Sequence, residues 1–268
     1  MHKFEQDYMN LVAKILLDGE SRETRNAKTL SLFGETLVID MGDTDLFPLL
    51  QGRKMYYKGI LGELAAIVRG PKHIDDFTKW GCNYWAQWAK PDGSINVDYG
   101  NAWFRGSQIA KLKANLRGNP TDRRMIISGW DPQNLDKLDL PCCHHTYQFY
   151  VRKGEYLDMT WSQRSVDTMI GLPSDIVFAY AWLISIANEF GYKPGRITMF
   201  LGDCHIYESH IDNAYEYVYR GRKQAELTDK PRYKMLAPRG SDFLKFEPEQ
   251  LYINNYTDLG KLGFELYA

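Results

Sequence analysis

The residues best suited to covalent chemistry lie near the middle of the chain, where Cys143 precedes His144. A thiolate is a strong nucleophile, and a neighbouring imidazole or guanidinium lowers the pKa of a thiol, so more of the reactive anion exists near neutral pH. Arg164 and Ser165 follow further along the chain, and the planar guanidinium of an arginine binds phosphate through a fork of donors. A Cys-His pair alone is a weak signal, because free cysteines are often small buried hydrophobes. Together these residue types predict a covalent enzyme that acts on a phosphorylated substrate.

The segments that must position Cys143 are predicted to be strands. Apolar and β-branched residues over 146–152 and 156–162 predict two strands joined by a turn at Lys153-Gly154. Residues 124–130 predict a further strand. Cys143 is therefore expected at the entrance of a strand.

Helical spacing of apolar residues places other polar candidates on helices. Residues 2–17 predict a first helix that stops at Gly19, and residues 55–68 predict a helix that carries Glu63. The apolar run 174–190 predicts a buried helix.

Two further segments of the sequence predict additional strands of the sheet. Residues 29–41 predict two strands with a turn around Gly34, and residues 196–202 predict a buried strand. No linker or repeat divides the chain. We therefore expect one α+β domain over residues 1–268, with a mixed β-sheet backed by helices.

Composition limits the class of function. The chain has 268 residues, 44% of them hydrophobic, and a formal net charge of −1, which argues against direct binding of the nucleic-acid backbone. No apolar run reaches the length of about eighteen residues that spans a membrane, and the first residues lack the apolar core of a signal peptide. We expect a soluble, cytoplasmic protein. The four cysteines, Cys82, Cys142, Cys143 and Cys204, show no zinc-type spacing, so we expect free thiols and no metal.

Short motifs spread through most of the chain give a more specific prediction. They are residues 29–34, 62–64, Trp85 with Trp88, 98–100, 122–124, 140–144, 163–167, 171–175 and 202–207. In order and in spacing, this set resembles the thymidylate synthase family. The resemblance implies a thymidylate synthase-like fold, a homodimer formed sheet to sheet, and 5,10-methylenetetrahydrofolate as co-substrate.

One position departs from the family pattern. Where thymidylate synthases carry asparagine to pair with the uracil edge, this chain has Asp175. An asparagine amide offers one donor and one acceptor, which suits uracil, whereas an ionised carboxylate only accepts and suits the amino group of cytosine if N3 of the ring carries a proton. The same exchange is found in the relatives that act on cytidine nucleotides, the phage deoxycytidylate hydroxymethylases. Asp175 therefore favours dCMP over dUMP. A structural alternative is that Asp175 caps the helix that follows it.

The resemblance also implies roles around the pyrimidine base. Cys143 would add to C6 of the ring and so activate C5 toward the one-carbon unit. Glu63 and Tyr99 would move protons near the base, and His144 would belong to the hydrogen-bond network around it.

Further matches concern the phosphate of the nucleotide. Arg164 and Ser165 would hold the 5′-phosphate, and Arg123 and Arg124 would reach the same phosphate from the partner subunit.

The amino-terminal loop, the sugar and the folate complete the expected site. A further phosphate arginine is expected in the loop, where Arg25 fits the spacing better than Arg22. His205 and Tyr207 alternate along a strand end and would face one target, the 3′-hydroxyl. The folate pocket would be formed by Trp85, Trp88, Asp167 and Gly171.

The sequence leaves the final product open. Capture of the exocyclic methylene by water would give 5-hydroxymethyl-dCMP, which the relatives with aspartate favour, and capture by hydride would give 5-methyl-dCMP. Two other hypotheses remain: a thymidylate synthase that acts on dUMP, and a silent homologue that binds nucleotide for regulation. Silence is made less favoured by an intact set of site residues: Cys143, Glu63, Tyr99, Arg164 and His205.

Overall fold

A six-stranded mixed sheet forms the centre of the computed structural model, which describes residues 1–267. The strand order is β1-β2-β6-β5-β4-β3, and only the β5–β6 pair is parallel. The strands are β1 (Glu20–Glu23), β2 (Lys28–Ile39), β3 (Ile126–Ser128), β4 (His144–Arg152), β5 (Tyr156–Asp167) and β6 (Lys193–Tyr207). A small second sheet pairs β7 (Arg232–Met235) with β8 (Leu251–Asn254). The predicted α+β class with a mixed sheet is confirmed.

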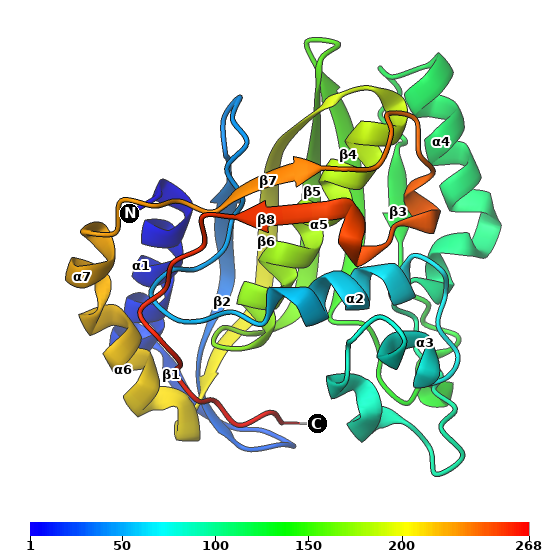
Figure 1. Ribbon diagram of the computed structural model, residues 1–268. Coiled ribbons are helices and arrows are strands. Elements are labelled where there is room, and N and C mark those ends of the chain that lie inside the picture. The colour runs from blue at the N-terminus through cyan, green and yellow to red at the C-terminus, as the bar shows by residue number, and fades with distance from the viewer. Residues whose placement is uncertain (268) are drawn as a thin grey trace.

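Helices cover one side of this sheet (Figure 1). The long helix α5 packs on β5 and β6, and α2 crosses in front of α5. The helices are α1 (Lys3–Asp18), α2 (Tyr57–Ile67), α3 (Asp75–Thr78), α4 (Gln108–Gly118), α5 (Gly171–Phe190), α6 (Ile211–Tyr219) and α7 (Gly221–Ala225). Among the helices of the described chain, none combines the length and the apolar character that crossing a bilayer requires.

Helix α5 begins earlier than the sequence predicted, and this changes the interpretation of Asp175. The helix starts at Gly171, so Asp175 lies in its second turn and does not cap it. The N–H groups of Met169 and Ile170 instead donate to the Asp167 carboxylate, at 2.9 and 3.1 Å. The helix-cap alternative for Asp175 is therefore wrong, and its carboxyl group is available for another role.

The segment around Gly34 also differs from the prediction. Residues Lys28–Ile39 form one continuous strand, because the pairing of β2 with β6 keeps the same register on both sides of Gly34. Gly34 has a φ of 82°, so it changes the local backbone direction without reversing the chain. Helix α4 was not predicted, although Ile109, Leu112 and Leu116 lie on its buried side at helical spacing.

A buried carboxyl group holds the amino-terminal helix against the loop that leads to the cavity. Glu5 is 1% exposed, and its Oε1 accepts from the N–H groups of Gln51 and Gly52 at 2.6 and 3.0 Å and from the Tyr217 hydroxyl at 3.1 Å. Burial nevertheless raises the pKa of Glu5 to about 7. The folded protein therefore binds the Glu5 proton more tightly than the unfolded chain does.

We predict that Glu5→Gln removes a pH dependence of stability. Stability from Glu5 is fully present below its unfolded pKa of 4.5 and is lost as pH rises through about 7. Because an amide oxygen can still accept all three hydrogen bonds, the variant should gain stability relative to the parent by on the order of 3 kcal/mol across this window. Urea unfolding at a series of pH values measures the difference, and parallel curves for the two proteins would contradict the prediction.

Candidate active site

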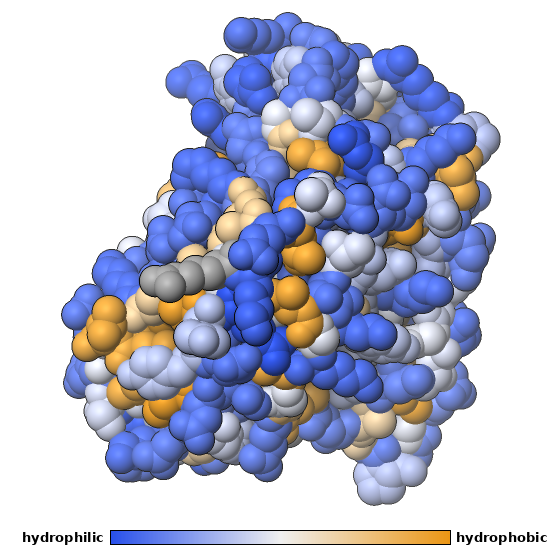
Figure 2. Space-filling view, turned by 60° about the vertical axis from the view of Figure 1, so that its left-hand side comes forward, coloured by the Kyte–Doolittle hydropathy of each residue, from blue (hydrophilic) through white to orange (hydrophobic). Residues whose placement is uncertain are grey.

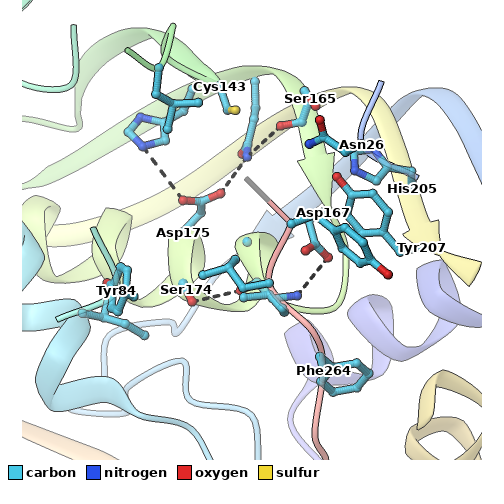
Figure 3. Close-up of a pocket in the computed structure, with 18 of the residues that line it drawn as sticks. Asn26, Tyr84, Cys143, Ser165, Asp167, Ser174, Asp175, His205, Tyr207 and Phe264 are labelled. Carbon is cyan, nitrogen blue, oxygen red and sulfur yellow. Dashed lines mark hydrogen bonds and ion pairs between the residues drawn. The ribbon is translucent and has the colours of Figure 1, made fainter. Parts of the chain in front are cut away.

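A cavity of about 680 Å³ lies where β5 and β6 end and α5 begins. Every residue predicted for the site lines it, except Arg123 and Arg124. These residues are Arg25, Glu63, Trp85, Trp88, Tyr99, Cys143, His144, Arg164, Ser165, Asp167, Gly171, Asp175, His205 and Tyr207. Figure 3 shows Cys143 and Asp175 near one another, with His205, Tyr207 and Ser165 grouped to the right.

Cys143 lies immediately before β4, as predicted, and its sulfur faces a fixed cation. Arg164 Nη2 is 4.0 Å from the Cys143 Sγ, and the guanidinium is held by the carbonyl groups of Cys142 and Pro141 at 2.9 and 3.0 Å. The Tyr99 hydroxyl accepts from the Cys143 N–H at 2.7 Å. Burial outweighs these favourable contacts and raises the pKa of the Cys143 thiol. The thiol therefore does not have the lowered pKa that the sequence suggested.

His144 does not activate the neighbouring thiol. Its Nδ1 contacts the Tyr147 hydroxyl, and its Nε2 lies 3.9 Å from Asp175 Oδ1. Burial lowers the pKa of His144 to about 3, so the imidazole is neutral and supplies no positive charge to Cys143. Its position instead fits the predicted place in a network around the base.

Asp175 extends from α5 into the cavity, and its side chain is only 17% exposed. Gln163 Nε2 donates to Asp175 Oδ2 at 2.6 Å. Burial still raises the pKa of Asp175 well above its usual range, which favours a protonated carboxyl group. Gln163 belongs to a predicted motif, but no role was assigned to it from the sequence.

A second carboxyl group, that of Glu63, also lines the cavity. The Tyr84 hydroxyl and the Trp85 indole N–H each donate to Glu63, both at 2.7 Å. Burial raises the pKa of Glu63 to about 7, which suits a group that both gives and takes protons near neutral pH. Sequence reasoning missed Tyr84, although it directly precedes a predicted pocket residue.

The two candidate phosphate-binding arginines of the amino-terminal loop, Arg22 and Arg25, have different surroundings. Arg22 pairs with Asp203 at 3.3 Å, whereas Arg25 lines the cavity together with Asn26. This placement favours Arg25 as the residue that faces a ligand. Asp203 also lies 3.2 Å from the His205 Nδ1, so it can fix the orientation of that ring.

Arg123 and Arg124 lie outside the cavity of their own chain. Arg124 is exposed, and its guanidinium donates twice to the Asp122 carboxylate, at 3.0 and 2.8 Å. Their predicted task in the site of a partner subunit remains a proposal.

The carboxy-terminal segment lines the cavity, and the length of residues 251–268 allows for such a placement. Phe264 and Tyr267 line the cavity, and the Tyr267 ring stacks on Tyr207 with 4.2 Å between centroids. His210 Nε2 donates to the Glu265 carbonyl at 2.7 Å, and Asn213 holds the Gly263 carbonyl. Ala268 lies outside the described residues.

The far wall suits a flat aromatic ligand. Trp85 and Trp88 lie 5.3 Å apart between ring centroids, and they join Ile170 and Gly171 in the cavity wall. Broad indole surfaces of this kind bind planar heterocycles. Within residues 1–267, no group of three His, Cys, Asp or Glu side chains is arranged to hold a metal ion.

We predict that Tyr84→Phe raises the pKa of Glu63 further. The Tyr84 hydroxyl stabilises the ionised carboxylate by donating to it, so its loss should raise that pKa by about one unit. A ¹³C NMR titration of labelled glutamate carboxyls, assigned with Glu63→Gln, measures this change. Tyr192→Phe is the control, because its hydroxyl donates to the distant Leu116 carbonyl. If the Glu63 carboxyl titrates in Tyr84→Phe as it does in the parent protein, the hydrogen bond from Tyr84 does not control the pKa of Glu63.

Comparison with known families identifies the chain. The family described as thymidylate synthase matches residues 6–268, which is nearly the whole sequence. The match includes the cavity residues and the sheet that carries them. The chain therefore belongs to the thymidylate synthase family, whose members use a folate to transfer a one-carbon unit to C5 of a pyrimidine nucleotide.

Proposed function

We propose that this protein transfers a one-carbon unit from 5,10-methylenetetrahydrofolate to C5 of dCMP. The observation that carries the choice of nucleotide is the Asp175 carboxyl group, which lines the same cavity as Cys143 and occupies the position where thymidylate synthases carry an amide. The proposed product is 5-hydroxymethyl-dCMP, with 5-methyl-dCMP as the close alternative.

The raised pKa of Asp175 gives this carboxyl group a property that an amide lacks. A neutral carboxyl can donate its proton to N3 of cytosine while its other oxygen accepts from the N4 amino group. When the Cys143 thiolate adds to C6, negative charge moves toward N3, and the proton can follow it from the carboxyl to the ring. Uracil already carries a proton on N3 and does not need an acid there.

The other side chains divide the remaining tasks. Arg164, Ser165 and Arg25 would bind the 5′-phosphate, because the two arginines supply positive charge to one end of the cavity. His205 and Tyr207 would hold the 3′-hydroxyl.

Proton movement at C5 would fall to Tyr99 and Glu63. Tyr99 touches the backbone of Cys143, so it lies close to the position of the reacting ring. The folate, when bound, supplies the electrophilic methylene carbon. Trp85 and Trp88 would hold its ring, with Asp167 and Gly171 completing that part of the pocket.

Two features of the cavity point to different products. Tyr84 and Glu63 place polar groups in the cavity wall, where they could bind a water molecule and favour hydroxymethyl transfer. The carboxy-terminal residues Phe264 and Tyr267 also line the cavity, and if they exclude water they would favour a methyl product. We retain the hydroxymethyl product, because the relatives with aspartate at this position favour it.

We also propose that the active form is a homodimer. The strands of the large sheet expose large apolar side chains: Phe33, Val38, Ile126, Tyr150 and Phe200. Figure 2 shows hydrophobic residues at the surface of the face that it presents, gathered mainly at its lower left. Pairing of two sheets would bury such side chains and would bring Arg123 and Arg124 toward the partner's cavity.

A specific observation supports dUMP as the second candidate substrate. A protonated carboxyl has one donor and one acceptor, as an asparagine amide does. Asp175 could therefore pair with the uracil edge without transferring its proton.

We predict that Asp175→Asn shifts the nucleotide preference from dCMP toward dUMP. An amide cannot pass a proton to N3, so the ratio of kcat/KM for dCMP over dUMP should fall at least about tenfold. Release of tritium from C5-labelled nucleotides measures both rates, and mass analysis of the products distinguishes methyl from hydroxymethyl.

Controls separate the competing functions. Cys143→Ser should abolish release from either nucleotide. Release from dUMP alone by the parent protein would refute dCMP as substrate, and release from neither would favour a silent homologue. An unchanged preference in Asp175→Asn would assign base selection to another residue.

The proposed dimer predicts complementation between inactive subunits. Cys143→Ser carries an intact pair, Arg123 and Arg124, whereas a variant with both arginines changed to alanine carries an intact Cys143. Mixing the two after partial unfolding should restore activity, because hybrid dimers then contain one complete site. Complementation is absent if both arginines act within their own chain.

A further inference from the structure

A buried indole lies behind the hydrogen bond that reaches Asp175. Trp161, on β5, is fully buried, and its Nε1 donates to Gln163 Oε1 at 3.1 Å. The Gln163 Nε2 then donates to Asp175 Oδ2 at 2.6 Å and faces the Ser165 carbonyl at 3.3 Å. The three side chains form a single line of hydrogen bonds from the core to the cavity.

The direction of this line is fixed by chemistry. An indole N–H can only donate, so the amide oxygen of Gln163 must face Trp161. The reversed amide would place two donors against each other at Trp161, and would place the amide oxygen against the Ser165 carbonyl and Asp175. Reversal would leave the buried Trp161 indole N–H without an acceptor, which costs about 1–3 kcal/mol, and would give an ionised Asp175 no donor from Gln163.

We infer that Trp161 is a positioning residue that sets the proton affinity of Asp175 by locking the orientation of the Gln163 amide. The sequence motif contains Gln163 but not Trp161, and nothing in the spacing of Trp161 indicates contact with the cavity. This inference rests on the proposed role of Asp175 in base recognition.

The fixed orientation of the Gln163 amide has a direct consequence for the proposed first step, the addition of Cys143 to C6 of cytosine. The Cys143 thiol first loses its proton to solvent, and Arg164 stabilises the thiolate. As the S–C6 bond forms, the electrons of the C5–C6 double bond move to form a C4–C5 double bond, and those of the N3–C4 double bond move to N3. N3 then takes the proton of Asp175, and the carboxylate that remains accepts from Gln163 Nε2. A Gln163 amide free to reverse would present its oxygen to that carboxylate and oppose the transfer.

Trp182 provides a matched control. It is also a fully buried tryptophan, but within residues 1–267 its Nε1 has no hydrogen-bond partner. Trp161→Phe and Trp182→Phe therefore remove similar volumes from the core, and only the first removes a donor from the line to Asp175.

The first readout needs no nucleotide and so does not depend on which substrate is correct. The carbonyl stretch of the protonated Asp175, isolated by subtracting the infrared spectrum of Asp175→Asn, reports its titration. Trp161→Phe should raise the midpoint by about one pH unit, the equivalent of one net hydrogen bond to the ionised form. Trp182→Phe should leave the midpoint unchanged. Equal midpoints in Trp161→Phe and Trp182→Phe would overturn the inference.

Two further variants distinguish loss of the Trp161 hydrogen bond from misfolding and from effects that do not act through Gln163. Incorporation of β-(3-benzothienyl)alanine at position 161 replaces the N–H by sulfur while keeping the shape of the ring, and should give the same shift as Trp161→Phe. Gln163→Met should also raise the midpoint, and adding Trp161→Phe to it should raise the midpoint no further, because the two residues act as one unit. Additive shifts would show that Trp161 acts independently of Gln163.

The kinetic readout separates this inference from the proposed function. Trp161→Phe should lower kcat for dCMP about tenfold relative to Trp182→Phe, with little change in KM, because proton transfer rather than nucleotide binding is impaired. If the parent protein turns over dUMP only, the proposed function fails, while the infrared midpoints still decide the role of Trp161. If it turns over dCMP and both tryptophan variants lose the same activity, Trp161 is merely structural.

Discussion

Removal of ionisable groups from water is the constraint on which the chemistry of this cavity depends. Burial raises the pKa of Cys143, of Glu63 and of Asp175, so the neutral form of each group is favoured more strongly than it would be in water. A charge in the cavity is then costly unless a partner stabilises it. Arg164 can do so for the thiolate and Gln163 for the Asp175 carboxylate. The cavity therefore favours reactions in which a bond forms and a proton moves together.

The fold provides these partners through close contact between neighbouring elements. Strands β5 and β6 run parallel, so their ends bring Arg164 and Ser165 next to the residues that follow Gly202. A Cβ atom on Gly202 would lie 2.7 Å from the Arg164 carbonyl oxygen, so a glycine is needed where the two backbones approach. The early start of α5, at Gly171, then turns Asp175 toward Cys143 instead of leaving it at the helix end.

Much of this arrangement could be predicted from the sequence, because its signals are local or belong to family motifs. The strand entrance at Cys143 follows from alternation and turn residues. The contacts of Tyr84 with Glu63 and of Trp161 with Gln163 could not be predicted, because residue type alone does not show where a side-chain donor points. The continuous strand through Gly34 was missed for a similar reason: β6, far away in sequence, determines the pairing of both halves.

The central claim is that Cys143 attacks a cytosine nucleotide whose recognition depends on Asp175. Fluorine at C5 cannot leave as a cation, so a 5-fluoro nucleotide should remain covalently attached after the one-carbon unit has been added. Intact-protein mass spectrometry with 5,10-methylenetetrahydrofolate and either 5-fluoro-dCMP or 5-fluoro-dUMP measures this directly. We expect a stable adduct with 5-fluoro-dCMP, mapped to Cys143 by peptide analysis. An adduct with 5-fluoro-dUMP alone, or with neither nucleotide, would contradict the claim.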